Sequence, residues 1–126
     1  MKRYSKQREI IMNNLKNRYD HPTAEMVYDS VREEVPNISL GTVYRNLKEM
    51  ASGDDVLSFT QNGKEHFDGN PIPHIHICCT LCGSIEDRIL GSTERELLTK
   101  DEFDIKNVII QGFCKKCTGN NNQIEL

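Results

Sequence analysis

The sequence predicts an α+β fold in which a winged helix is followed by a small β-α-β domain with a four-cysteine zinc site. Three observations support this prediction. The first part of the chain has three segments with helical spacing of apolar residues, followed by two strand-like segments around an Asn-Gly turn. A segment rich in Gly and Pro then interrupts the pattern. The remainder contains two Cys-x-x-Cys pairs, whose spacing is typical of zinc sites.

Three helices are expected before the hairpin. The first covers residues 6–18, where Ile11 and Leu15 belong to an apolar stripe. Thr23 is suited to cap the second helix and Ser39 the third, because a hydroxyl oxygen accepts a hydrogen bond from an amide that the helix leaves free. The third helix shows apolar residues at core spacing on one face and polar residues on the other.

A β-hairpin should follow these helices. Residues 56–60 and 64–68 flank Asn62-Gly63, and Asn-Gly is a strong signal for a tight turn between antiparallel strands. Three helices and a hairpin make a winged helix, so we expect a winged-helix DNA-binding domain over residues 1–68. Residues 69–73, Gly-Asn-Pro-Ile-Pro, have the composition of a linker.

Residues 74–126 should form a metal-binding dimerisation domain. We expect a strand from His74, a helix over about residues 92–100 and a second strand over about residues 103–113. The second strand contains the apolar run Val108-Ile109-Ile110, which two strands cannot shelter from water. Pairing with a second copy of the chain would cover it.

The charge distribution separates the two halves. Residues 1–50 carry nine Lys and Arg against seven Asp and Glu, whereas residues 51–126 carry seven against twelve, within a net charge of −3. The acidic half therefore suits cations. The charged, polar start and the absence of a long apolar run favour a cytoplasmic protein with reduced thiols over a secreted or membrane protein.

Two matched Cys-x-x-Cys pairs predict a structural zinc site, because each pair presents two sulfurs to one tetrahedral ion. Its ligands would be Cys79, Cys82, Cys114 and Cys117. Iron in a rubredoxin-like site has the same spacing, and ferric thiolate would colour the protein red. Redox use of one pair is disfavoured, since neither pair follows a strand at the start of a predicted helix.

A second metal site is predicted from histidines and carboxylates. His74 and His76 share one face of a strand, and Asp68 and Asp87 flank that strand. Mixed imidazole and carboxylate ligands suit Fe(II), Mn(II), Zn(II), Co(II) or Ni(II). Three further side chains leave alternatives open: His66 is either an extra ligand or a residue of the wing surface, Glu86 could replace its neighbour Asp87, and Cys78 is either a buried apolar residue or a thiol near the ion.

Several motifs together resemble the ferric uptake regulator (Fur) family of bacterial metal-dependent repressors over nearly the whole chain. They are His21-Pro22-Thr23-Ala24, Gly41-Thr42-Val43-Tyr44-Arg45-Asn46-Leu47, His74-Ile75-His76, Cys79-Thr80-Leu81-Cys82-Gly83 and the Cys114–Cys117 pair. The resemblance implies a structural zinc on the four cysteines. It also implies a regulatory Fe(2+) or Mn(2+) ion, bound by His21, Asp68, His74, His76 and Asp87.

The carboxylates point to one branch of this family. Iron sensors usually have glutamates at the two carboxylate positions, whereas the peroxide-sensing PerR branch has aspartates, as found here at Asp68 and Asp87. By resemblance, Fe(II) would react with hydrogen peroxide and a ligand histidine, His21 or His74, would be oxidised, while Mn(II) would act as an unreactive corepressor. Iron sensing of the Fur type is the alternative.

The third helix should read DNA, because the corresponding helix of a winged helix enters the major groove. Its candidate contacts are Thr42, Tyr44, Arg45, Asn46 and Lys48. Arg45 departs from the asparagine associated with some peroxide regulators. A chain with so little positive charge should bind double-stranded DNA as a homodimer on a palindromic operator.

An alternative from another class is a small metal enzyme or a rubredoxin-like electron carrier. An enzyme needs an open coordination position with a general base beside it. Glu65 and Glu86 are the candidates for that base, but no substrate pocket can be identified from the sequence. The sequence therefore favours a non-enzymatic regulator.

Overall fold

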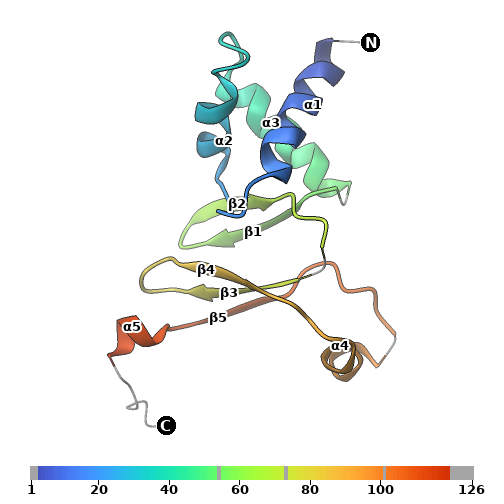
Figure 1. Cartoon of the computed structure of the whole chain (residues 1–126), viewed down its shortest axis with the longest axis vertical. Helices are drawn as coiled ribbons and strands as arrows, with labels where there is room; N and C mark the ends of the chain where they lie inside the picture. The colour runs from blue at the N-terminus through green and yellow to red at the C-terminus, as the bar shows by residue number, and fades with distance from the viewer. Residues whose placement is uncertain (1–2, 54, 73, 101, 120–126) are drawn as a thin grey trace. The chain divides into compact units, whose positions relative to one another are not determined.

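The computed structural model describes residues 3–119 apart from positions 54, 73 and 101, with only the backbone for residues 3–5. The chain forms two compact units, Met1–Ile72 and Pro73–Leu126. The division falls within the stretch of Gly and Pro predicted as a linker. Each unit is described by itself below, and Figure 1 labels their helices and strands.

The N-terminal unit begins with three helices, α1 (Arg3–Lys16), α2 (Ala24–Val31) and α3 (Leu40–Ser52). The two predicted caps are present: Thr23 Oγ1 accepts a hydrogen bond from Met26 N at 3.3 Å, and Ser39 Oγ accepts one from Thr42 N at 3.1 Å. The first helix begins and ends earlier than predicted, while the other two follow their caps.

A hairpin of β1 (Leu57–Gln61) and β2 (Lys64–Asp68) completes this unit, with Gln61 paired to Lys64 across the turn. Asn62 and Gly63 both have positive φ, at 53° and 81°, as a two-residue type I′ turn requires. The helices lie on one side of the hairpin (Figure 1). Their buried core consists of Ile11, Leu15, Val27, Val31, Ile38, Val43, Leu47, Met50, Val56 and Phe67. The unit is therefore the predicted winged helix.

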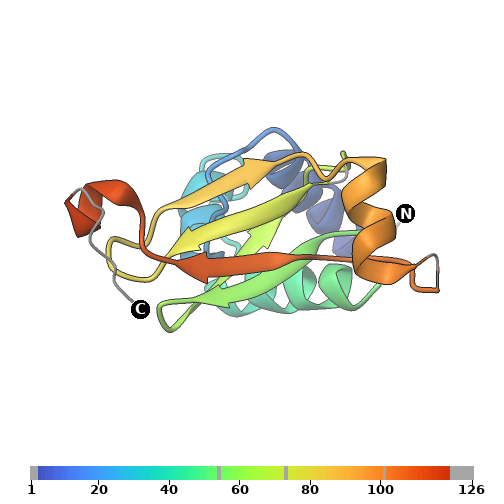
Figure 2. The ribbon, with the colours of Figure 1, turned by 90° about the horizontal axis from the view of Figure 1, so that it is seen from below.

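The C-terminal unit is a three-stranded sheet with two helices. It contains β3 (Ile75–Cys79), β4 (Ile85–Arg88), α4 (Ser92–Thr99), β5 (Ile109–Gly112) and α5 (Lys115–Thr118). The strand order is β4-β3-β5, with β4 antiparallel and β5 parallel to the central β3. Figure 2 shows α4 and α5 at opposite ends of the sheet.

The predicted β-α-β unit is present as β3, α4 and β5, but the structure adds β4 and shortens the last strand. β4 forms because the chain turns back directly after Cys79. Gly83 has φ of 81°, its amide donates to Cys79 O at 2.9 Å, and Cys79 N donates to Ser84 O at 3.0 Å. The sequence indicates residues 79–82 only as part of the zinc site and predicts no strand after them.

The α+β class is confirmed. Of the helices in the described part of the chain, none combines the length and the apolar character needed to cross a bilayer.

Candidate metal centres

The four predicted zinc ligands meet at one place in the C-terminal unit. The sulfur atoms of Cys79, Cys82, Cys114 and Cys117 all lie within 4.8 Å of one another. Two of the separations are 3.8 Å, for Cys79–Cys117, and 3.9 Å, for Cys82–Cys114. A tetrahedron with Zn–S bonds of about 2.3 Å has sulfur–sulfur edges of about 3.8 Å. The cluster therefore fits a structural zinc ion, and all its cysteines are free of disulfide bonds.

Backbone amides prepare this cluster for a cation. Cys114 N and Cys82 N lie 3.4 Å and 3.5 Å from Cys79 Sγ, and hydrogen bonds from these two amides lower the pKa of the Cys79 thiol to about 6. A hydrogen bond from the Ser84 hydroxyl lowers the pKa of Cys82. The hydrogen bond to Cys114 raises the pKa of Cys117 to about 12. The thiolate is the form that binds zinc. Because the two amides lower the pKa of Cys79, this cysteine is largely a thiolate near neutral pH even before zinc binds.

A second group of ligand atoms lies on the same sheet. His74 Nε2 and His76 Nε2 are 3.2 Å apart, and Asp87 Oδ1 lies 3.6 Å from the first and 3.7 Å from the second. Ligands about 2.1 Å from one ion lie about 3.0–3.4 Å apart in octahedral or tetrahedral geometry. These three atoms form a triad of two histidines and one carboxylate, an arrangement that binds Fe(II) and similar ions and leaves coordination positions open.

The sheet register builds this triad. His76 pairs with Asp87 across the antiparallel β3–β4 ladder, so both side chains point to the same face. His76 Nδ1 lies 3.0 Å from Asn107 Oδ1. The amide oxygen accepts a hydrogen bond from Nδ1–H, which leaves the lone pair of Nε2 directed at the other ligand atoms of the triad. His74 Nε2 faces this lone pair at 3.2 Å, so a cation between the two nitrogens could bind both.

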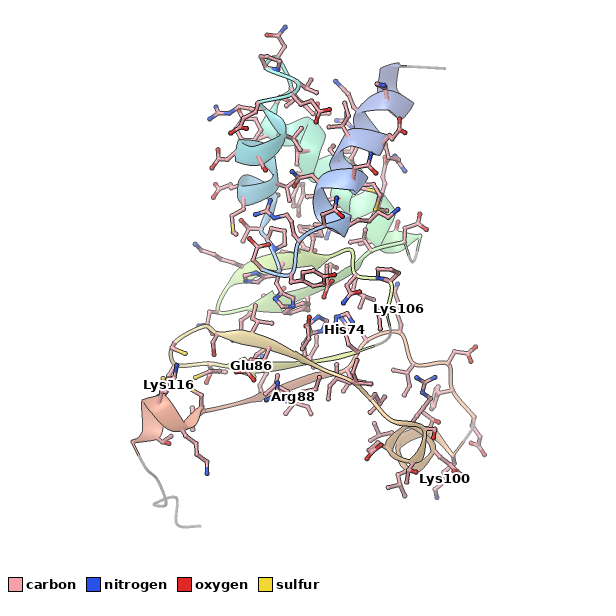
Figure 3. All side chains as sticks on the ribbon, viewed as in Figure 1. His74, Glu86, Arg88, Lys100, Lys106 and Lys116 are labelled. Atoms are coloured by element: carbon pink, nitrogen blue, oxygen red, sulfur yellow. The ribbon has the colours of Figure 1, made fainter. Side chains whose placement is uncertain are left out.

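Asp87, not Glu86, is the carboxylate of this triad. Glu86 pairs with Ile77 across the ladder and therefore lies on the opposite face, where its carboxylate is 2.8 Å from Arg88 Nη2. Figure 3 shows His74 on one side of the sheet and the labelled Glu86 and Arg88 on the other. Cys78 is buried, and burial raises the pKa of its thiol, as expected for a small apolar core residue.

The N-terminal unit presents a separate pair of predicted ligands. His21 Nε2 lies 3.6 Å from Asp68 Oδ2, at the end of β2. The other oxygen of Asp68 accepts a hydrogen bond from Asn70 N at 2.9 Å. His66 is not directed at this pair through Nδ1, because that atom lies 2.7 Å from the backbone oxygen of His21. Nothing in the sequence signalled that contact.

The predicted DNA-reading residues do not all lie on the surface of α3. Tyr44, Arg45 and Lys48 are exposed, and Thr42 is half-buried. Asn46 is fully buried: its Nδ2 donates to Thr42 O at 2.9 Å and its Oδ1 accepts from Arg8 Nε at 3.2 Å. Asn46 was therefore wrongly predicted as a DNA contact. Its spacing from the core residues Val43 and Met50 was the signal for burial.

One side chain of the wing contacts two of these exposed residues. Glu65 on β2 accepts hydrogen bonds from Lys48 Nζ, at 3.0 Å and 3.3 Å, and from the Tyr44 hydroxyl at 3.3 Å. The hydrogen bond to Glu65 raises the pKa of Lys48. The wing and α3 thus share one polar cluster on an exposed face.

A winged helix joined to a sheet with a closed four-sulfur site and an open histidine–carboxylate triad defines a metal-binding regulator. Comparison with known proteins identifies the family. Residues 2–112 match the model of the Ferric uptake regulator family. The chain belongs to this family, whose members are metal-responsive transcriptional regulators and not enzymes, so the enzyme and electron-carrier alternatives are set aside.

Known relatives and solved structures resemble this chain over most of its length. It is 34% identical over 121 residues to the peroxide-responsive repressor PerR of Staphylococcus aureus (strain USA300), covering 91% of this chain and 82% of the relative. A crystal structure of the Campylobacter jejuni peroxide stress regulator superposes with a TM-score of 0.74 at 31% identity, covering 90% of each chain. The Helicobacter pylori ferric uptake regulator Fur, at 23% identity and a TM-score of 0.72, covers 93% of this chain and 83% of its own, and shows the shared fold.

Proposed function

We propose that this chain is a homodimeric transcriptional repressor that senses hydrogen peroxide through a regulatory Fe(II) ion and uses Mn(II) as an unreactive corepressor. The observation that carries the proposal is the triad of His74, His76 and Asp87, which supplies two imidazoles and one aspartate and leaves room for further ligands. The Staphylococcus aureus relative is named a peroxide-responsive repressor and the Campylobacter jejuni protein a peroxide stress regulator, and both names support the same branch.

The ligand set proposed for the regulatory ion adds His21 and Asp68 of the N-terminal unit to this triad. The support is chemical. Three neutral histidines and two aspartates around a divalent ion are formally neutral, so the ion can be buried without an unpaired charge. The ligand atoms of the N-terminal unit, His21 Nε2 and Asp68 Oδ2, are 3.6 Å apart, close enough for both to bind one ion.

A bound Fe(II) ion would activate hydrogen peroxide beside the ligand histidines. In the net reaction one oxygen atom of the peroxide enters a ring C–H of His21 or His74, and the other leaves as water. The oxidised ring is a poorer ligand, so the chain loses its regulatory ion. Mn(II) does not support this reaction, which makes it a corepressor that peroxide leaves in place.

Metal binding controls DNA binding in this proposal. An ion that binds residues of both units more tightly in one arrangement shifts the chain toward that arrangement, by as much as its affinities differ. Thr42, Tyr44, Arg45 and Lys48 of α3 would then contact the major groove of a palindromic operator. Each winged-helix domain has few cationic side chains, so DNA binding requires the two domains of a dimer. The affinity for DNA should fall steeply as the salt concentration rises.

Dimer formation is proposed through the C-terminal unit. Ile109 and Ile110 of β5 are 39% and 48% exposed, and Leu97 and Phe103 are 74% and 75% exposed. Large apolar side chains left this exposed suit a surface that pairs with another chain. A second copy satisfies the two-fold symmetry of a palindromic operator.

The test is DNA binding by the zinc-loaded protein with Fe(II), with Mn(II) or with neither, on a duplex selected from random sequences by the Mn(II) form. Both ions should promote binding, and hydrogen peroxide should abolish binding only in the Fe(II) form. Binding that survives peroxide in both forms supports iron sensing of the Fur type instead. Equal binding with and without a regulatory ion contradicts the switch.

A further inference from the structure

His66 contacts the backbone of a proposed ligand residue and not its side chain. Its Nδ1 lies 2.7 Å from the carbonyl oxygen of His21. A carbonyl oxygen only accepts hydrogen bonds, so Nδ1 of His66 must carry the proton. The ring is therefore held in the Nδ1–H form.

The backbone of His21 needs such support. Its φ is 53°, in the left-handed region that residues other than glycine seldom adopt. Two successive hydrogen bonds from β2 hold this segment: His66 Nδ1 donates to His21 O, and Phe67 N donates to Pro22 O at 2.8 Å. Asp68 follows on the same strand and faces His21 Nε2. Three consecutive residues of β2 thus act on the His21 segment.

Aromatic packing fixes the ring that donates. Phe59, which pairs with His66 across the hairpin, stacks on it with a centroid distance of 5.8 Å and an interplanar angle of 22°. The same Phe59 meets the His21 ring edge-on at 6.2 Å and 68°. The two histidine rings therefore share one aromatic neighbour, which limits how far either can turn.

We propose that His66 is a positioning residue for the regulatory metal site. Its Nδ1–H donates to the His21 carbonyl and so stabilises the left-handed backbone conformation of His21. In that conformation the His21 imidazole faces Asp68. Without this hydrogen bond the His21 backbone relaxes and the ligand nitrogen leaves its place. The inference depends on the proposed role of His21 as a ligand and adds a residue that acts through it.

Removing this hydrogen bond should cost about 10-fold to 100-fold in Mn(II) affinity, as is typical when a residue that orients a metal ligand is lost. The matched variants are His66→Leu, which lacks the donor, and His66→Asn, whose amide nitrogen replaces Nδ1. His66→Gln is a further control, because its longer side chain places the amide nitrogen near the position of Nε2.

Mn(II) affinity should be measured by competition with a chelator on the full-length, zinc-loaded chain. We expect His66→Asn to bind like the wild type, with His66→Leu and His66→Gln both weaker and all three melting near the wild-type temperature. His66→Leu with wild-type affinity would overturn the proposal. If His66→Leu does not fold, the comparison of His66→Asn with His66→Gln decides: equal loss in both overturns the proposal.

Two further measurements separate this proposal from the proposed function. Nitrogen NMR of the zinc-only protein should show the proton of His66 on Nδ1, and an unprotonated Nδ1 would contradict the geometry without any regulatory metal. His21→Ala tests the ligand itself. If His21→Ala binds Mn(II) normally, the proposed ligand set fails; if it does not, while His66→Leu binds normally, only the positioning role fails.

Discussion

The four-cysteine cluster and the histidine–carboxylate triad lie on one small sheet, yet they are built for different tasks. The cysteines supply four sulfur atoms at tetrahedral spacing, so a zinc ion bound there has no free position. The triad supplies three atoms, and an ion bound there keeps open positions for other ligands. A closed site stabilises a fold, whereas an open site responds to what else can bind or react.

The two centres also use the chain differently. The cysteine cluster joins the end of β3 and the turn after it to α5 and its N-cap, segments more than thirty positions apart in the sequence. The triad requires only the His76–Asp87 pairing and the residue before β3. Loss of the first should therefore unfold a unit, and loss of the second should leave the fold intact.

The largest effect is expected from Cys79→Ser. Structural zinc contributes about 10–16 kcal/mol in zinc-finger peptides, more than the stability of most small domains. We expect the variant to lose its zinc and the C-terminal unit to unfold, as measured by metal analysis and circular dichroism. The matched control is Cys78→Ala, which removes a thiol outside the cluster and should keep one zinc per chain. Wild-type melting of a zinc-free Cys79→Ser protein would refute a structural role.

His76→Ala should affect the open site alone. We expect Mn(II) affinity to fall by more than about 100-fold, beyond the loss typical of outer-shell residues, because a ligand is removed. Zinc content should stay near that of the wild type, and the melting temperature should fall far less than in Cys79→Ser, by no more than the loss of one buried ring explains. Loss of zinc together with Mn(II) would show that the two centres are not independent. Competition with a chelator and metal analysis on the same sample provide both values.

Asn107 should have a smaller effect on the same ion. Its oxygen lies 3.0 Å from His76 Nδ1 and orients the ligand nitrogen. Asn107→Leu should weaken Mn(II) binding by about 10-fold to 100-fold. Asn107→Asp keeps an acceptor oxygen and should retain affinity. If both variants bind Mn(II) like the wild type, Asn107 does not orient the triad.

The smallest effect is expected away from both metals. Glu65 holds Lys48 and Tyr44 on the proposed DNA-reading face. Exposed ion pairs are worth about 0.2–1 kcal/mol, so Glu65→Gln should raise affinity for duplex DNA by about 1.4-fold to fivefold. One additional phosphate contact would steepen the logarithmic salt dependence by about 0.9. In a Lys48→Ala background this gain should disappear; a gain that persists there would indicate general charge repulsion instead.

The sequence predicted most of the fold because its signals were local. Thr23 and Ser39 cap the helices they were expected to cap, and Asn62-Gly63 forms the expected turn. β4 was missed because its four residues carry little periodicity, and its pairing depends on the tight turn after Cys79. Such pairing is a tertiary effect that short segments do not encode.

The candidate sites were predicted to the extent that ligand chemistry shows in spacing. The Cys-x-x-Cys pairs and His-x-His identified the first ligands, and the family resemblance indicated Asp87. The reason why its neighbour Glu86 faces away lies in the register of β4, which the sequence did not predict. Asn107 and His66 act through single hydrogen bonds to residues distant in the sequence, 31 and 45 positions away. The residues around Asn107 and His66 show no sequence pattern that predicts these contacts.

Peptide mass spectrometry after peroxide treatment of the Fe(II)-loaded, zinc-containing protein tests the contrast between the two centres most directly. The open site should react: one oxygen atom should appear on His21 or His74, with zinc retained and the four cluster cysteines unmodified. The Mn(II) form should show no histidine oxidation. Oxidised cluster cysteines with released zinc, and unmodified histidines, would contradict the assignment of the open site as the sensor.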